Sequence, residues 1–286
     1  MKKFRLEWFI AFQYLLPQHI LSRSGGFLAE TRIAWIKNIL IKIFIRIYKI
    51  NLDEAIYDSP QSYESFNAFF IRALKKDARP IDNHCSSIVC PADGIVSQAG
   101  CINEGAILQA KGKSFSSSTL LGSNDKYAKS FLNGEFITIY LSPKDYHRVH
   151  MPIDGRLVLT RYIPGKLFSV NLQTASHIDG LFAKNERLVC IFDTPAGLCA
   201  IILVGAMMVA GIETAWRTHY CPQVPLVDYA DSKNIYLKKG EEMGRFKFGS
   251  TVIVMFEHGK TSMLDKYEPG LITRVGELMT THEQHQ

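Results

Sequence analysis

Near its C-terminal end the chain contains the tripeptide Gly249-Ser250-Thr251, followed by the apolar run 252–256. Glycine leaves its carbonyl carbon sterically open and tolerates backbone conformations that other residues avoid. A serine hydroxyl directly after it can attack that carbonyl, which is the first step of a chain that cuts itself. The alternative is a Gly-Ser bulge in an ordinary strand, in which neither residue takes part in chemistry.

Two histidines, His147 and His150, lie three residues apart between Pro143 and Pro152. Histidine titrates near neutral pH, so such a pair suits a base and a second proton-transfer group. On a strand the two side chains would face opposite sides, whereas in a turn both can face one pocket. A metal site is the other interpretation, but the His-Glu-x-x-His arrangement is absent and no third ligand stands out. We therefore predict no metal.

Asp93 lies in the sequence Pro91-Ala92-Asp93-Gly94, which is typical of a tight turn after a strand. An aspartate in a turn commonly accepts hydrogen bonds from its own backbone. A carboxylate on a rigid turn can also orient a catalytic imidazole. The residues alone leave both interpretations open.

The elements that must position these residues change character after Arg79-Pro80. Residues 1–75 are predicted to be a helical, membrane-associating region, and residues 76–286 a β-rich catalytic domain. Short β-branched runs separated by glycine and proline predict strands at 87–90, 136–141, 157–160, 188–192, 200–204 and 251–256. Weaker patterns indicate helices near 116–121 and 174–182. The expected fold class is α+β, with a mostly antiparallel sandwich or open barrel after the helical region.

The clearest helical pattern runs from Trp35 to Ile50. Its polar positions recur at helical spacing, and aliphatic or aromatic residues fill the rest of its surface; the polar positions are Asn38, Lys42, Arg46 and Lys49. A narrow cationic stripe beside a broad apolar face fits the membrane–water interface. An ordinary core helix with one solvated edge is the alternative. The aromatic segment 8–16, also flanked by cations, favours the membrane surface.

Composition excludes several classes of protein. With 286 residues and 47% hydrophobic content, the chain can bury a large core. A net charge of +6 without arginine-rich runs or zinc-finger spacing indicates no nucleic-acid partner. The six scattered cysteines predict a reducing compartment and small buried side chains. Glu7 and Gln13 interrupt the first apolar segment, so we expect neither a cleaved signal peptide nor a transmembrane helix.

With these residues in view, the chain closely resembles the bacterial phosphatidylserine decarboxylases over nearly its full length. The resemblance rests on Asp93, His147, His150, Gly249-Ser250-Thr251 and further motifs, namely 66–70 (FNAFF), 109–112 (QAKG), 164–171 (PGKLFSVN), 185–187 (NER) and, most specifically, 244–251 (GRFKFGST). Family members often carry leucine where this chain has Phe248, which is a conservative departure.

The resemblance implies an enzyme that makes its own cofactor. Carried onto this sequence, Asp93 orients His150, His150 takes the proton of Ser250, and the freed oxygen attacks Gly249. Elimination then leaves a large fragment, 1–249, and a small one, 250–286, whose first residue becomes a covalent pyruvoyl group. The two fragments are expected to stay together as a non-covalent heterodimer.

The resemblance also implies the substrate. The pyruvoyl group at Ser250 would form a Schiff base with the amine of phosphatidylserine, and His147 would protonate the carbon that has lost carbon dioxide, giving phosphatidylethanolamine. The enzyme would work as a peripheral protein on the anionic, cytoplasmic face of the cell membrane. Lys113, Lys166 and Arg187 are candidates for binding the head group, and equally are candidates for ordinary surface charges.

Two rival functions remain. A pyruvoyl-dependent decarboxylase of a soluble amino acid would share the cleavage motif, but the amphipathic N-terminal region speaks against it. An inactive, lipid-binding peripheral membrane protein would share that region, but the intact Asp93, His150 and Ser250 speak against it.

Overall fold

A computed structural model describes residue 10 and residues 12–14, 17–123, 125–207, 211–218, 220, 227–229, 234–247, 249–261 and 267–282. Most of the aromatic segment 8–16 lies outside the described residues, as do Cys221 and Phe248.

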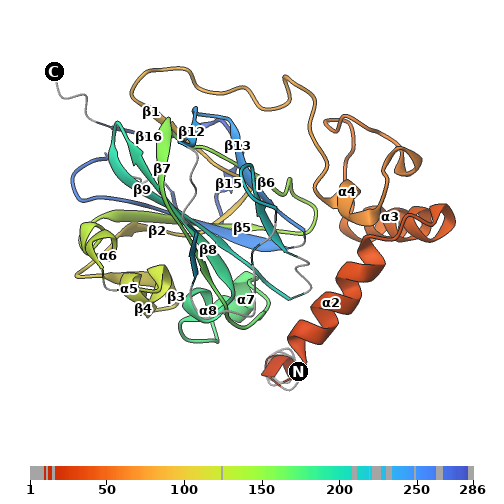
Figure 1. Ribbon diagram of the computed structural model, residues 1–286, viewed down its shortest axis with the longest axis horizontal. Coiled ribbons are helices and arrows are strands. Elements are labelled where there is room, and N and C mark those ends of the chain that lie inside the picture. The colour runs from red at the N-terminus through yellow and green to blue at the C-terminus, as the bar shows by residue number, and fades with distance from the viewer. Residues whose placement is uncertain are drawn as a thin grey trace.

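The helices gather at the N-terminal end and in short pieces between strands. They are α2 (Gln18–Ala29), α3 (Ala34–Tyr48), a 3₁₀ turn (Pro60–Ser62), α4 (Phe66–Phe70), α5 (Ser117–Leu121), α6 (Lys126–Ser130), α7 (Leu172–Ala175) and α8 (Leu181–Lys184). In Figure 1, α2, α3 and α4 lie together at one side of the strand-rich part.

The strands begin after residue 86. They are β1 (Ser87–Val89), β2 (Gly94–Cys101), β3 (Ala106–Ala110), β4 (Lys113–Ser116), β5 (Glu135–Leu141), β6 (Arg148–His150), β7 (Gly155–Ile163), β8 (Arg187–Thr194), β9 (Gly197–Val204), β10 (Ile212–Thr214), β11 (Val227–Tyr229), β12 (Tyr236–Leu237), β13 (Glu242–Phe246), β14 (Ser250–Phe256), β15 (Ile272–Thr273) and β16 (Leu278–Thr281). All six segments predicted to be strands fall on strands, so this part of the prediction is confirmed.

One large sheet organises the strand-rich part. Its described strands follow the order β11-β7-β8-β9-β14-β5-β2-β15, with β12 also paired to β7, and every one of these pairs is antiparallel. Strand β14 lies in the middle, between β9 and β5. The expected α+β class with a mostly antiparallel sheet is confirmed, and the described strands form no closed barrel.

Both faces of this sheet are buried, which explains why β14 is an almost continuous apolar run. Val252, Val254 and Phe256 point into one core, which also contains side chains of β1, β6, β13 and β16. Ile253 and Met255 point into a second core under the β3–β4 hairpin and the short helices α5 to α8. The alternation follows from the two-residue period of a strand. Because a core covers each face of the sheet at β14, neither face of this strand contacts solvent.

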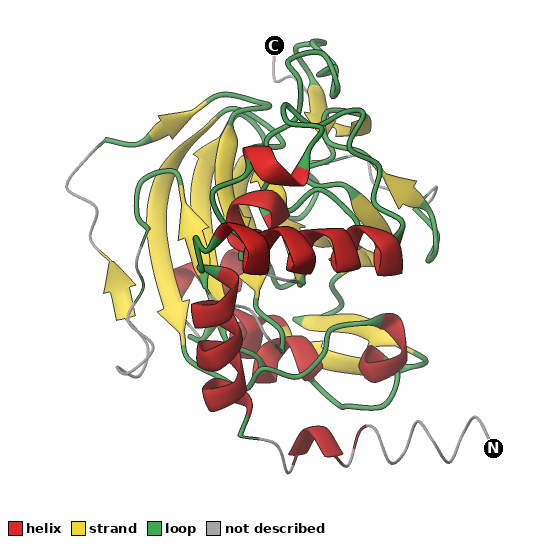
Figure 2. Cartoon of the chain, turned by 90° about the vertical axis from the view of Figure 1, so that its right-hand side faces the viewer, coloured by secondary structure: helices red, strands yellow, loops and turns green. Residues whose placement is uncertain are grey.

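The N-terminal helices have a small aromatic core of their own. Ile41 and Phe44 on α3 pack against Phe66, Phe69 and Phe70 on α4. Figure 2 shows α3 lying across the front of the molecule, with α2 running away from it. The predicted helix from Trp35 to Ile50 is thus confirmed within two residues, and it joins the β-rich part through α4.

Two expectations are wrong in detail. Cys85 and Cys101 are exposed, whereas Cys90, Cys190 and Cys199 are buried as expected. The helical pattern at 174–182 is broken, because α7 ends at Ala175 and α8 begins only at Leu181, and Gly180 between them takes a left-handed conformation with φ of 62°. Glycine adopts that conformation without a steric cost, so the chain turns there.

Candidate active site

One end of β5 brings the predicted site residues together. Strands β2 and β14 flank β5 and run antiparallel to it, so both begin where β5 ends. Asp93 directly precedes β2, Ser250 opens β14 opposite Leu141, and the loop that carries His147 follows Leu141. The backbone N–H of His150 donates to the carbonyl of Pro91 at 2.8 Å, which holds the aspartate turn against β6.

Ser250 is fully buried, and its hydroxyl has no hydrogen-bond partner among the described residues. The same holds for the hydroxyl of its neighbour Thr251. Pairing of β14 with β5 starts at Ser250 and continues to Phe256 without a register shift, so the bulge interpretation is wrong for this strand. A buried hydroxyl without a partner costs about 1–3 kcal/mol of desolvation.

Gly249 lies just before the strand and is partly exposed. Its φ angle is not in the left-handed region, and no described atom outside its chain neighbours comes within 4 Å of the place a Cβ would take. Neither backbone conformation nor crowding therefore requires glycine here. What glycine provides is an unshielded carbonyl carbon.

The hydrogen bonds of His150 define where its proton sits. Nδ1 lies 2.8 Å from the carbonyl oxygen of Gly240, and Nε2 lies 3.0 Å from the hydroxyl of Tyr146. A carbonyl only accepts, so Nδ1–H donates to it, and the neutral ring keeps its lone pair on Nε2. Burial lowers the pKa of His150, although the carboxylates of Glu242 and Asp93 act in the opposite direction. The ring is thus a neutral base that receives a hydrogen bond from Tyr146.

The simpler interpretation expected Asp93 to accept hydrogen bonds from its own turn, and the structure shows other partners. The hydrogen bonds of Asp93 do not include one to His150. Its carboxylate accepts from Arg79, with Nε 3.0 Å from both oxygens and Nη2 2.5 Å from Oδ2, and from the backbone N–H of Val275 at 2.9 Å. Arg79 also pairs with Glu54 at 2.8 Å, and these two acids raise the pKa of its guanidinium against the effect of burial. The negative charge of Asp93 acts to raise the pKa of His150, although less than the backbone carbonyl of Gly240 and Glu242 do.

His147 is fully buried and lies against the aromatic core of the helical region. Its ring stacks on Phe70 with 4.1 Å between centroids, and its Nε2–H donates to the carbonyl of Ser142 at 3.0 Å. Its Nδ1 has no partner among the described residues. Burial lowers the pKa of His147 to about 3, and the charge of Arg72 acts in the same direction. His147 is therefore neutral near pH 7.

The structure adds residues that sequence reasoning missed. Tyr146 is four residues before His150 and could have been noticed as a further polar ring in the same motif. The role of Gly240 could not, because its backbone carbonyl is a group that every residue type has. Of the three head-group candidates, Arg187 donates to four backbone carbonyls, those of Thr119, Leu120, Ala183 and Asn185. Lys113, on β4, forms an ion pair with Asp179, with 2.6 Å between Nζ and Oδ1. Lys166 is exposed.

A serine with an unpartnered hydroxyl, a neutral histidine and a carboxylate at one sheet end are the components of an acyl-transfer site on an α+β scaffold. Comparison with known proteins then names the family. A family model described as phosphatidylserine decarboxylase matches residues 66–281, and a second, described as PSD, matches residues 8–49.

Curated relatives align along almost the whole chain. The chain is 50% identical over 281 residues to the phosphatidylserine decarboxylase proenzyme of Pseudomonas putida (strain W619), covering 96% of this chain and 98% of that protein. It is 51% identical over 275 residues to the proenzyme of the same name from Alcanivorax borkumensis, covering 95% and 94%. The relative from Azotobacter vinelandii is 49% identical over 274 residues, covering 94% and 96%. The chain belongs to the phosphatidylserine decarboxylase family and is a decarboxylase.

Proposed function

We propose that this chain cuts itself between Gly249 and Ser250 and then converts phosphatidylserine to phosphatidylethanolamine and carbon dioxide. The observation that carries the proposal is the Ser250 hydroxyl, which is fully buried, has no hydrogen-bond partner among the described residues, and stands next to the open carbonyl of Gly249. Family membership supplies the substrate, because the relatives are named for phosphatidylserine and as proenzymes.

The self-cleavage step can be written with this chain's own atoms. The proton of Ser250 Oγ goes to His150 Nε2, and Oγ bonds to the carbonyl carbon of Gly249. The peptide C–N bond then breaks and His150 gives the proton to the leaving nitrogen, which leaves an ester and a free amine. Removal of the Ser250 α-proton then breaks the Cβ–Oγ bond and frees the Gly249 carboxylate. Water replaces the resulting enamine nitrogen, which leaves as ammonia. Because Tyr146 holds Nε2 in the uncut chain, this bond must give way before Ser250 can use the base.

The residues around position 250 fit a pyruvoyl group at that position. The Thr251 hydroxyl has no partner among the described residues, so it is a donor that a carbonyl oxygen of that group could accept from, and β14 holds the backbone from both sides through β5 and β9. A pyruvoyl group supplies an electron sink for the carbon that loses carbon dioxide. Because β14 is central in the sheet, the fragment that begins at residue 250 would remain attached after the cut as the small subunit of a heterodimer.

His147 is the candidate for protonating the product carbon. In the neutral ring the single proton is on Nε2, where the Ser142 carbonyl holds it, and Nδ1 offers a lone pair. To act as the donor, Nδ1 would take up a proton from water and pass it to the carbon that has lost carbon dioxide, which returns the ring to its neutral form. Its packing on Phe70 fixes the ring plane, so the nitrogen that donates the proton keeps a defined position.

The side chains that α3 leaves exposed support a location at the membrane surface. Trp35, Ile39, Ile43 and Ile47 recur every fourth residue on the outer side of the helix, and Ile47 is 65% exposed. Lys42, Arg46 and Lys49 are exposed beside them. An exposed aliphatic stripe between cations suits an anionic lipid surface. Among the described residues, no helix is long and apolar enough to span a membrane.

Three single substitutions test the division of roles. Ser250→Ala and His150→Ala are expected to stay as one uncut chain, whereas His147→Ala is expected to cut itself but to form little phosphatidylethanolamine. Fragments on a denaturing gel report the cut, and thin-layer chromatography of labelled phosphatidylserine reports the product. Cleavage of the His150→Ala chain, or full decarboxylation by His147→Ala, would overturn the assignment. A panel of free amino acids run in parallel tests for a soluble substrate.

A further inference from the structure

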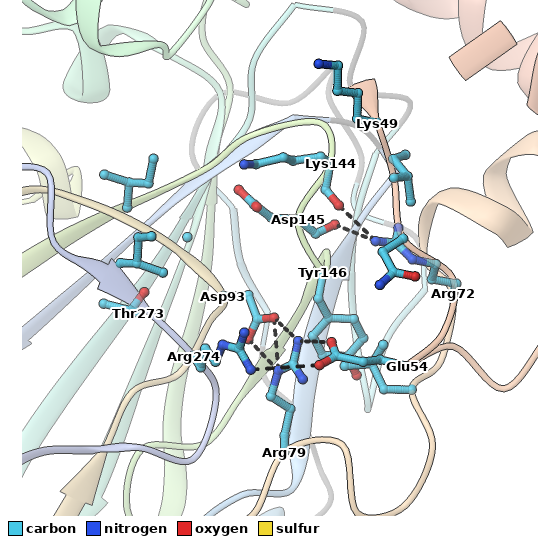
Figure 3. A pocket seen from close by; sticks show the side chains of 16 residues that line it. Lys49, Glu54, Arg72, Arg79, Asp93, Lys144, Asp145, Tyr146, Thr273 and Arg274 are labelled. Atoms are coloured by element: carbon cyan, nitrogen blue, oxygen red, sulfur yellow. Dashed lines mark hydrogen bonds and ion pairs between the residues drawn. The ribbon is translucent and has the colours of Figure 1, made fainter. Parts of the chain in front are cut away.

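A polar cavity of about 320 Å³ lies where the helical region meets the sheet. Segments 49–54 and 72–79 line it from the helical side, and segments 93–95, 144–146 and 272–274 line it from the sheet. Figure 3 shows the charged side chains of both parts facing one another across it. Junctions between two parts of a chain are common places for ligands.

The charges around this cavity are not balanced. Five cationic side chains line it against three carboxylates; these are Lys49, Arg72, Arg79, Lys144 and Arg274, and Glu54, Asp93 and Asp145. Two of the carboxylates, Glu54 and Asp93, bind Arg79, and Arg274 lies 3.8 Å from Glu54. The third, Asp145, accepts from the backbone and hydroxyl of Ser142, and burial raises its pKa.

Three cations are therefore left for a ligand. Lys49, Lys144 and Arg72 form no ion pair with any carboxylate of the described residues. Lys49 follows the last residue of α3, and Lys144 is exposed at the rim of the cavity. In Figure 3 the two lysine side chains extend in the same direction, with Lys49 above Lys144.

Arg72 is the unusual member of this set, because only 5% of its surface is exposed. Its Nη2 donates to the carbonyls of Lys144 at 2.9 Å and Asp145 at 3.3 Å, but Nε and Nη1 have no partner. A buried guanidinium with unused donors is costly, and burial lowers its pKa. An anion in the cavity that Arg72 lines would stabilise its charge.

We propose that this cavity binds the phosphodiester anion of the lipid head group, with Arg72 as the inner cation and Lys49 and Lys144 at the rim. The proposal rests on the proposed function, since it assigns the place where the same substrate is held. The cavity lies beside the catalytic groups, because Asp93 and Tyr146 form part of its wall. It also lies beside the C-terminal end of α3, the helix with the lipid-facing stripe. A phosphodiester at this position joins acyl chains on the membrane side to a serine group on the catalytic side.

The other anion of the head group is the carboxylate, and it suits this site less well. Decarboxylation removes its charge, so an ion pair to it would be stronger in the substrate than in the transition state and would slow the reaction. A phosphodiester keeps its charge throughout, so binding it holds the substrate without raising the barrier. Arginine is also the side chain whose fixed donors match phosphate oxygens.

The test is a binding titration with soluble probes on the uncut Ser250→Ala chain, in which no bond to the substrate amine can form. Glycerophosphoserine is titrated by calorimetry, with dimethyl phosphate and serine as competitors. We expect dimethyl phosphate to displace glycerophosphoserine and serine not to do so. Arg72→Lys should weaken binding about tenfold or more, and Lys144→Gln, which changes an exposed side chain, should weaken it severalfold. Lys129→Gln on α6 removes the same charge away from the cavity and should change nothing.

Unchanged binding in both cavity variants would overturn the proposal, and so would competition by serine but not by dimethyl phosphate. Competition by inorganic phosphate with equal strength in all variants would indicate a different anion site and would likewise overturn it. The proposed function is judged separately, by phosphatidylethanolamine formation in the wild-type protein. A wild type that fails to decarboxylate, while Arg72→Lys still loses head-group binding, would contradict the function and leave the site standing.

Discussion

His147 gives a prediction whose size can be worked out from its burial. The pKa of its imidazole falls from 6.5 to about 3 in the folded chain because the ring is fully buried. A histidine with a depressed folded pKa binds a proton more readily when the chain is unfolded, so its contribution to stability is complete well above pH 6.5 and is lost as the pH falls below that value. Between pH 7 and pH 5 the loss amounts to about 2 kcal/mol for this one group.

The perturbation is His147→Gln, which removes the titrating group and keeps an N–H that can donate to Ser142. Both proteins carry Ser250→Ala, so that each unfolds as a single chain. Urea unfolding is followed by tryptophan fluorescence at pH 7 and pH 5, and the quantity compared is the change in unfolding free energy of each protein between the two pH values. His150 and all other histidines are present in both, so their contributions cancel.

The chain with His147 should lose about 2 kcal/mol more than the glutamine variant on going from pH 7 to pH 5. Equal losses in the two proteins would refute the reasoning, because His147 would then titrate alike in the folded and unfolded chain. In that case the ring could carry a charge near neutral pH, and its role in the reaction would have to be that of a cationic donor.

Three further predictions address the base, the membrane contact and the core. The Tyr146→Phe chain should cut itself about fivefold faster, because a hydrogen bond of about 1 kcal/mol no longer occupies Nε2 of His150. The rate is measured as fragment formation after cell-free synthesis. Slower cutting would mean that Tyr146 relays the proton. The double variant Ile43→Gln, Ile47→Gln should bind anionic vesicles more than tenfold more weakly in a co-sedimentation assay, since each exposed isoleucine contributes about 1 kcal/mol to binding when it enters the lipid. Unchanged sedimentation would place the membrane contact elsewhere. Ile253→Ala should lower the unfolding free energy by about 2–5 kcal/mol, measured with urea, and a loss below about 1 kcal/mol would contradict its position in the packed centre of the sheet.

The strong patterns of the sequence were sufficient for the central elements. Strand β14 was predictable because its apolar run is long enough to be buried on both faces, and α3 because its polar residues recur at helical spacing. Strand β2 was missed, since glycine, serine and glutamine interrupt the apolar residues of 94–101, and only its pairing with β5 and β15 makes it a strand. Tertiary hydrogen bonding decided that element, and a local pattern does not report it.

The site divides in the same way. Ser250, His147 and His150 could be proposed from the sequence, because their residue types suit the chemistry wherever they lie, and their roles stay predictions. Their contacts were not predictable, since the proton on His150 is fixed by a backbone carbonyl 90 residues further along the chain, and Asp93 binds Arg79 through a fold-dependent approach. The cavity around Arg72 is formed by five separate segments, so no single motif could indicate it.

The central claim is that the chain makes its own reactive group by cutting at Ser250, and the denatured intact mass of the purified protein tests it most directly. The account predicts two masses, one for residues 1–249 and one for residues 250–286, with the smaller lighter by one ammonia than hydrolysis of the peptide bond would give. A single mass for the uncut chain, or a small fragment that still carries an N-terminal serine, would contradict it.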